Sequence, residues 1–320
     1  MGDTVESVAA PDADDRAAWL HKLDQIGEDS GYFEPLGKRH WAFFVDDSPT
    51  LVVTFETAEA IRTGSPAQLP MGHAIAAEQG WSHLCIIADG ETWYRDEAVY
   101  RYFDRLVDDA FFEDFDRVVF YGAGMGGYAA ACFSVTAPGA TVIAVSPVAS
   151  LDPRVSEWDG RYRHARRLDF TRRYGFAPDM IEGAGEVFVI YDPEVTLDAM
   201  HAALFTRPFV HKLRCRHFGA APEAALGDIG VVGAMIRAGA KGRVAPSTFH
   251  RAFRQRRSHT PYILALLDHL DRADRPKLAH ALCANVLKRL SAPRISDRYE
   301  ALRKTLEAHE AGSDASTSQD

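Results

Sequence analysis

Closely spaced glycines follow an apolar run in the segment Arg117–Ala131, which reads RVVFYGAGMGGYAAA. The apolar residues predict a strand, the glycines a tight turn, and the alanines a helix that begins at once. Two chemistries use such a turn. In a dinucleotide-binding turn, Gly122, Gly124 and Gly127 occupy the G-x-G-x-x-G positions, and the helix N-terminus faces a pyrophosphate. In a nucleophile elbow, G-x-S-x-G, the third position carries the nucleophile, and here that position is Gly124.

The sequence around the turn favours the elbow. A dinucleotide-binding domain usually begins with its glycine turn, whereas three strands are predicted before this one, at His40–Val45, Leu51–Glu56 and Leu84–Ala88. Such a domain also needs an acidic residue about 20 residues farther on, at the end of the next strand. The next predicted strand, Thr141–Ser146, ends in Ser146-Pro147 and offers no carboxylate. We therefore keep a nucleotide-dependent oxidoreductase only as an alternative.

Side chains that would complete a hydrolytic triad occur in the expected chain order of nucleophile, acid and histidine. The predicted strand Val187–Tyr191 is followed by Asp192 and then by Asp198. The predicted strand Val210–Cys215 is followed by His217. Because the carboxyl ends of parallel strands meet at one edge of a sheet, these residues are candidates for one site. Only the serine is missing.

The elbow segment resembles the GxSMGGYAA elbow of a bacterial group of α/β-hydrolase-like proteins. The similarity covers roughly residues 50–225 and includes the stretches 144–147, 150–153 and 191–202. The resemblance implies Gly124 at the nucleophile position, Asp192 or Asp198 as acid, and His217 as base. Similar chains often carry the label phosphoadenosine phosphosulfate reductase, but no SGGKDS-type pyrophosphate loop and no ECGxH-type cysteine motif occurs here.

Gly124 leaves the elbow without an attacking atom, so the leading hypothesis is a degenerate hydrolase that binds a small molecule or a partner without catalysis. Backbone N–H groups near Phe55 and at Met125 would still form an oxyanion-type donor pair. The predicted ligand-binding residues are Gly122, Gly124, Met125, Gly126 and Phe55. As an alternative, His217 and an aspartate activate a water directly, or another nucleophile such as Ser146 acts. We expect no cofactor and no metal.

The chain is expected to form one α/β domain with a mostly parallel, doubly wound sheet of the α/β-hydrolase-like type, because short apolar strands alternate with helices. From about residue 245 the strands stop and helices follow. The predicted boundaries are an N-terminal tail and helix at 1–30, the α/β domain at 31–244 with an insertion at 151–180, a helical subdomain at 245–310, and a disordered tail at 311–320.

Composition narrows the function classes. Of the 320 residues 47% are hydrophobic and 25% charged, and the net charge is −9, which disfavours a nucleic-acid partner. The acidic N-terminus is not a secretory signal, and no apolar run is long enough to span a membrane. The four cysteines form no C-x-x-C pair and are expected to be reduced. We therefore predict a cytoplasmic protein without a membrane partner.

Two arginine clusters stand out in this acidic chain. One lies in the insertion, at Arg161, Arg163, Arg166, Arg167, Arg172 and Arg173, and the other in the C-terminal part, at Arg251, Arg254, Arg256 and Arg257. Each is either a solvated face paired with aspartates or a surface for an anion. We accordingly expect a small-molecule ligand, with an anion among the candidates, and leave open a protein partner or a homo-oligomer.

Overall fold

The structure is a computed structural model that describes residues 13–317, so the predicted N-terminal tail at 1–12 and residues 318–320 lie outside it. One eight-stranded sheet forms the centre of the molecule, in the order β1-β2-β4-β3-β5-β6-β7-β8. The strands are β1 (Gly31–Leu36), β2 (His40–Val45), β3 (Thr50–Thr57), β4 (Ser82–Ala88), β5 (Arg117–Ala123), β6 (Thr141–Val145), β7 (Glu186–Tyr191) and β8 (Val210–Arg214).

Strands β3 to β8 run parallel, whereas β2 is antiparallel to both β1 and β4. Strand β1 was not predicted, because Gly31 and Pro35 interrupt its apolar pattern. Proline is tolerated there since β1 lies at the edge of the sheet and pairs only with β2.

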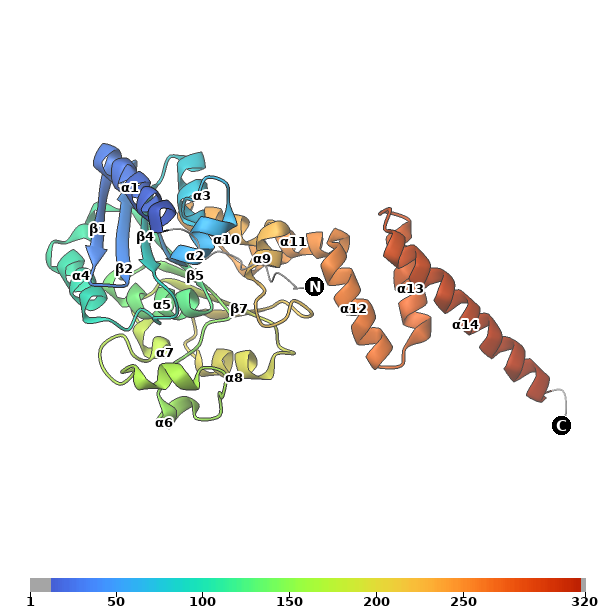
Figure 1. Ribbon diagram of the computed structural model, residues 1–320. Helices are drawn as coiled ribbons and strands as arrows, with labels where there is room; N and C mark the ends of the chain where they lie inside the picture. Colours follow the sequence, from blue (N-terminus) through green and yellow to red (C-terminus); the bar gives the residue numbers. More distant parts are fainter. Residues whose placement is uncertain (1–12, 318–320) are drawn as a thin grey trace, which may run out of the picture.

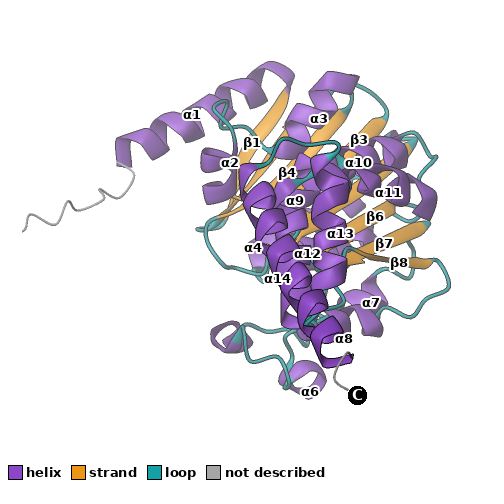
Figure 2. Ribbon diagram, turned by 90° about the vertical axis from the view of Figure 1, so that its right-hand side faces the viewer, coloured by secondary structure: helices purple, strands orange, loops and turns teal. Residues whose placement is uncertain are grey.

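Helices cover both faces of the sheet, as Figures 1 and 2 show. Alternate residues of each strand face opposite helices: Phe120 packs in the cluster with α5, while Val119 and Tyr121 pack in the cluster with α10. Strands buried on both faces explain the continuous apolar runs in the sequence. The helices of this part are α1 (Ala13–Ser30), α2 (Ala58–Gly64), α3 (Met71–Gln79), α4 (Glu97–Asp108), α5 (Met125–Phe133), α8 (Thr196–Leu204), α9 (Glu223–Asp228), α10 (Val231–Ala240) and α11 (Pro246–Ala252).

The predicted insertion at 151–180 contains only short helices: α6 (Pro153–Ser156), η3 (Arg163–Arg167) and α7 (Ala177–Met180). Arg95, in the loop after β4, anchors it by donating to three backbone carbonyls of residues 169, 173 and 174 at 2.6–2.8 Å. The hydroxyl of Tyr128 in α5 donates to the carbonyl of Tyr174 at 2.9 Å. The insertion is therefore fastened to the sheet through α5 and the β4 loop.

Three C-terminal helices extend away from the sheet and pack on one another (Figure 1). They are α12 (Thr260–Arg272), α13 (Pro276–Leu287) and α14 (Pro293–Thr317), and η4 (Phe253–Ser258) joins them to α11. Helix α14 continues to Thr317 and so occupies most of the segment 311–320, for which we predicted a disordered tail.

The strand order, the antiparallel second strand and the helices on both faces give the chain an α/β-hydrolase-like fold with a C-terminal helical subdomain. All four cysteines are buried and unpaired. Within the described residues, no helix combines the length and the apolar character that crossing a bilayer requires.

Candidate functional site

The predicted strand, turn and helix at the glycine cluster are present as β5, Gly124 and α5. Gly124 has φ 53° and ψ −116°, a strained conformation that glycine adopts at the least cost. Its N–H donates to the carbonyl of Val145 at 2.8 Å, and its carbonyl accepts from the N–H of Tyr128 at 3.0 Å. A Cβ atom at Gly124 would meet no heavy atom within 4 Å, so the tip of this turn between β5 and α5, called the elbow here, faces open space.

The neighbouring glycines are required by close backbone packing. A Cβ atom on Gly122 would lie 2.1 Å from the carbonyl oxygen of Gly126, and one on Gly126 would lie 2.3 Å from the carbonyl oxygen of Phe55. A Cβ atom on Gly127 would lie 3.0 Å from the carbonyl oxygen of Val145. Packing alone therefore accounts for this glycine spacing, without a bound dinucleotide.

A cavity of about 900 Å³ lies beside the elbow and is called the elbow cavity here. Phe55, Ala123, Met125 and Gly126 contribute to its lining from the sheet and the turn, and the remaining walls come mainly from α2, α3, α9 and α10. Most of the lining side chains are apolar. No residue of the insertion 151–180 and no histidine lines it.

Two carboxylates line the elbow cavity. Glu56, at the end of β3, accepts from the N–H groups of Met71 and Gly72 at 2.8 and 3.1 Å and so caps the N-terminus of α3. Glu223 accepts from the Tyr121 hydroxyl at 2.7 Å. Burial raises the pKa of both carboxyl groups, although these hydrogen bonds oppose the shift.

Asp192, a candidate triad acid, is 1% exposed and binds backbone rather than imidazole. One carboxylate oxygen accepts from the N–H groups of Phe218 and Gly219, both at 2.8 Å, and the other accepts from the N–H of Glu194 at 2.9 Å. Asp192 therefore holds the loop that carries His217, but no hydrogen bond or ion pair joins it to the imidazole of His217.

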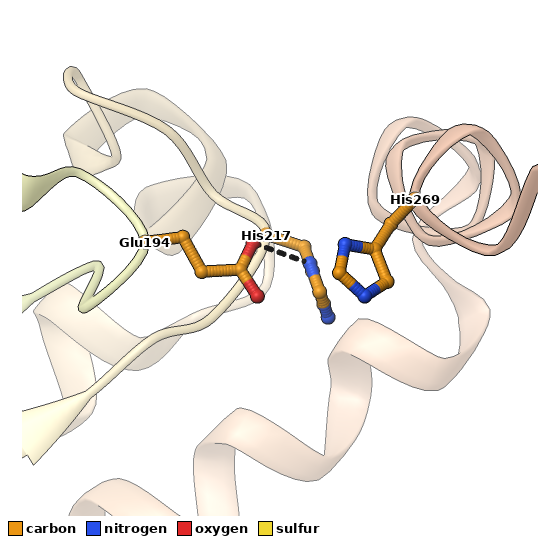
Figure 3. A group of neighbouring side chains, drawn as sticks. All are labelled: Glu194, His217 and His269. Atoms are coloured by element: carbon orange, nitrogen blue, oxygen red, sulfur yellow. Dashed lines mark ion pairs between the residues drawn. The ribbon is translucent and has the colours of Figure 1, made fainter. Parts of the chain in front are cut away.

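His217, the candidate base, adopts φ +66°, and its Nδ1 lies 2.9 Å from Oε2 of Glu194. Its ring also lies 4.8 Å, between centroids, from the ring of His269 in α12 (Figure 3). One ligand atom from each of Glu194, His217 and His269 lies within 4.8 Å of the others, a donor set that zinc accepts. His217 belongs to this group rather than to the lining of the elbow cavity.

Asp198, the other candidate acid, belongs to a buried polar network with the insertion. Its Oδ1 accepts from Arg161 at 2.6 Å, and Arg161 also binds Asp159, which is fully buried. Asp159 Oδ2 lies 3.0 Å from Nε2 of His201, whose Nδ1 accepts from the N–H of Ala149. Burial raises the pKa of Asp198 against the opposing effect of Arg161, and burial lowers the pKa of His201.

Asp198 lies in the first turn of α8, which begins at Thr196 after the cap residue Val195. Ser146, the alternative nucleophile, has a buried Oγ and a residue exposure of 8%, which disfavours it as an attacking group. Phe55 lines the elbow cavity, is 4% exposed, and packs its ring against those of Tyr94 and Phe103.

Sequence reasoning missed the polar residues that the structure places at these sites, Glu56, Glu223, Glu194 and His269. Glu56 ends a predicted strand and Glu223 follows Pro222 at a helix start, so position alone would have made both candidates. No sequence signal pairs His269 with His217, because 51 residues, which include α9, α10, α11 and η4, separate them.

No protein-family model and no curated protein sequence matches the chain significantly. Solved structures that it resembles include a putative esterase from Staphylococcus aureus, at 15% identity and TM-score 0.37 over 66% of this chain and 86% of that one. The esterase domain of a Rhodothermus marinus protein has 15% identity and TM-score 0.40, over 64% of this chain and 95% of that one. A hyperthermophilic esterase from Pyrobaculum calidifontis has 15% identity and TM-score 0.40, over 70% and 92%. Because these scores are low, the assignment depends on the strand order: the chain has an α/β-hydrolase-like fold whose elbow carries glycine.

Proposed function

We propose that this protein binds a small molecule in the elbow cavity and does not hydrolyse it. The observation that carries this proposal is Gly124: the elbow has the backbone path of a nucleophile turn, but its tip has no side chain. The cavity of about 900 Å³ beside it has the size of a ligand site.

The surroundings of the elbow support a non-catalytic role. General-base catalysis needs a base within hydrogen-bond reach of the nucleophile or water. No histidine lines the elbow cavity, His217 pairs with Glu194, and Asp192 is occupied by three backbone N–H groups. The alternative in which His217 and Asp192 activate a water requires the two side chains to interact, and each of them has other partners.

The lining of the cavity indicates the ligand class. Apolar side chains such as Ile61, Leu69 and Val232 provide most of the contact surface. Glu56 and Glu223 bring negative charge or, when protonated, a hydroxyl donor. Arg237 at the rim is paired with Glu78. The cavity therefore favours a neutral or weakly basic amphipathic molecule over the anion considered from the sequence.

Hydrolysis of p-nitrophenyl esters of short to long acyl chains tests the absence of catalysis. We expect wild type and Gly124→Ser both to release nitrophenol no faster than buffer. The serine Cβ enters open space, and the positive φ costs about 1–3 kcal/mol, so the variant folds. Its hydroxyl still lacks a base. Turnover by wild type that disappears in His217→Ala would contradict the proposal.

Binding of a neutral apolar dye tests the cavity itself. We expect Nile red fluorescence to rise with wild type and the apparent affinity to fall about tenfold in Ala224→Trp, because the exposed Ala224 lines the cavity and an indole fills it. The matched control is Ala203→Trp, at an exposed position of α8 outside the cavity. Equal affinity in all three proteins would place the dye elsewhere and leave the cavity without a ligand role.

A further inference from the structure

A second hollow, of about 410 Å³, lies at the end of β8 against η4 and α12. Its cationic lining, which we call the arginine hollow, consists of Arg214, Arg216, Arg254, Arg256 and Arg257. His217 and His250 also line it, together with the rings of Phe253 and Tyr262. The arginine hollow shares no lining residue with the elbow cavity, so a ligand of this hollow is independent of the proposed function.

Most of these arginines lack a counter-charge. Among the described residues, the side chains of Arg214, Arg216, Arg254 and Arg257 make no ion pair within 4.0 Å and no hydrogen bond. A protein of net charge −9 thus holds a group of unpaired positive charges around one concavity. Because like charges repel, an anion that enters the hollow removes an unfavourable interaction as well as forming new contacts.

The arginine cluster of the insertion differs in this respect. Arg161 pairs with Asp159 and Asp198, Arg172 with Asp169, and Arg173 with Asp104. These pairs match the solvated or structural interpretation given from the sequence for half of that cluster. Arg166 instead donates to backbone carbonyls, and Arg163 and Arg167 make no ion pair within 4.0 Å in the part of the chain that the structure describes. The insertion cluster is therefore neutralised in part, whereas four of the five arginines of the hollow make neither an ion pair nor a side-chain hydrogen bond within residues 13–317.

Part of the hollow is held in place before any ligand binds. Arg256 donates to the carbonyl of Phe253 at 2.7 Å, and its guanidinium lies 4.3 Å from the centroid of the Phe253 ring. Arg254 and Arg257 flank it on the short helix η4, and Arg214 and Arg216 face them from the end of β8. The same positive charge disfavours a divalent cation at the adjoining group of Glu194, His217 and His269 (Figure 3).

We propose that the arginine hollow binds a multiply charged phosphate-bearing anion of the size of a triphosphate. Guanidinium groups present rigid forks of N–H donors that match phosphate oxygens in pairs, and charge-assisted hydrogen bonds of this kind are the stronger ones. Several forks converging from two elements suit a chain of phosphates better than a single carboxylate. Inorganic oligophosphate and the triphosphate of a nucleotide present the same chemistry.

Isothermal titration of the full chain with sodium tripolyphosphate and, separately, with ATP tests the proposal. We expect saturable binding that weakens as ionic strength rises. Arg254→Gln/Arg257→Gln should weaken it at least about tenfold. The matched control, Arg101→Gln/Arg294→Gln, removes the same charge at two exposed arginines outside the hollow and should change the affinity less than about twofold.

The two ligands distinguish the sources of the phosphate. Equal binding of tripolyphosphate and ATP, lost in the hollow variant, supports recognition of the phosphate chain alone. Binding of ATP only, if it is lost in the same variant, supports the hollow as the binding site and indicates that the nucleoside makes an additional contact. Absence of binding to either at low ionic strength overturns the proposal, and so does a control variant that weakens binding as much as the hollow variant.

Discussion

Asp159→Asn is expected to lower the free energy of unfolding by about 3 kcal/mol, although the two side chains have the same shape. Asp159 is fully buried and accepts from Arg161 and His201. Asparagine removes the negative charge and directs an N–H₂ group at one of these two donors. The partly buried guanidinium of Arg161 then keeps only Asp198 as a counter-charge, and one N–H donor loses its acceptor. Both effects lower the free energy of unfolding.

Urea unfolding of Asp159→Asn against Asp169→Asn measures this effect. Asp169 lies in the same insertion, pairs with Arg172 and is exposed. Since exposed ion pairs contribute little, Asp169→Asn should change the free energy of unfolding by less than about 1 kcal/mol. Equal losses in the two variants would show that the Asp159 network does not hold the insertion.

Acidification from pH 6.5 to pH 4 is expected to destabilise the protein strongly, because several histidines are buried and neutral. Burial lowers the pKa of His40 to about 4, and it also lowers the pKa values of His83 and His201. Between pH 6.5 and pH 4 these histidines bind protons in the unfolded chain but remain largely neutral in the folded protein. The free energy of unfolding therefore falls as the pH falls. From its shift, His40 alone accounts for about 3 kcal/mol.

His40→Gln isolates this contribution. His40 is 1% exposed, and its Nε2 lies 2.8 Å from the Thr92 hydroxyl, a contact that a glutamine amide can replace. We expect the loss of stability between pH 6.5 and pH 4 to be smaller by about 3 kcal/mol in the variant. The exposed His21 provides the matched control, since His21→Gln should leave the pH dependence unchanged. The measurement is urea unfolding at a series of pH values.

Below pH 4 the protonation of the Asp159 carboxylate also lowers the free energy of unfolding. Burial tends to raise the pKa of Asp159, but the hydrogen bonds from Arg161 and His201 outweigh it and bring the pKa to about 2. Its stabilisation is therefore complete above its unfolded pKa near 4 and is lost as the pH falls toward 2.

Local pattern was enough to predict most of the sheet. Strand β2 has the predicted bounds His40–Val45, and the other predicted strands differ from the observed ones by only a few residues. Strands buried on both faces produce apolar runs that are visible without tertiary information. The edge strand β1 was not predicted, because Gly31 and Pro35 interrupt its apolar pattern. Pro35 is tolerated there because one side of the strand is unpaired.

The elbow was also predictable from the sequence. Gly122, Gly126 and Gly127 are required by contacts within the turn and with strands β3 and β6, and Gly124 accepts a positive φ. These requirements operate over a few residues, so the spacing of glycines indicates the turn. The sequence predicted an insertion at 151–180 but not its position relative to the elbow cavity. The insertion does not line that cavity, and Arg95 and Tyr128 bind its backbone.

The sequence by itself determined the parallel sheet, the glycine elbow and the absence of a serine at its tip. Only the tertiary structure decided the partners of the candidate acid and base. Chain order places Asp192 and His217 at neighbouring strand ends, but Asp192 binds three backbone N–H groups, and His217 faces Glu194 and His269. The direction of His217 follows from its own loop backbone and from α12, which docks through contact between Tyr262 and Phe218. Such long-range packing cannot be predicted from sequence periodicity, because it depends on the complementary surfaces of two elements that exist only after both have folded.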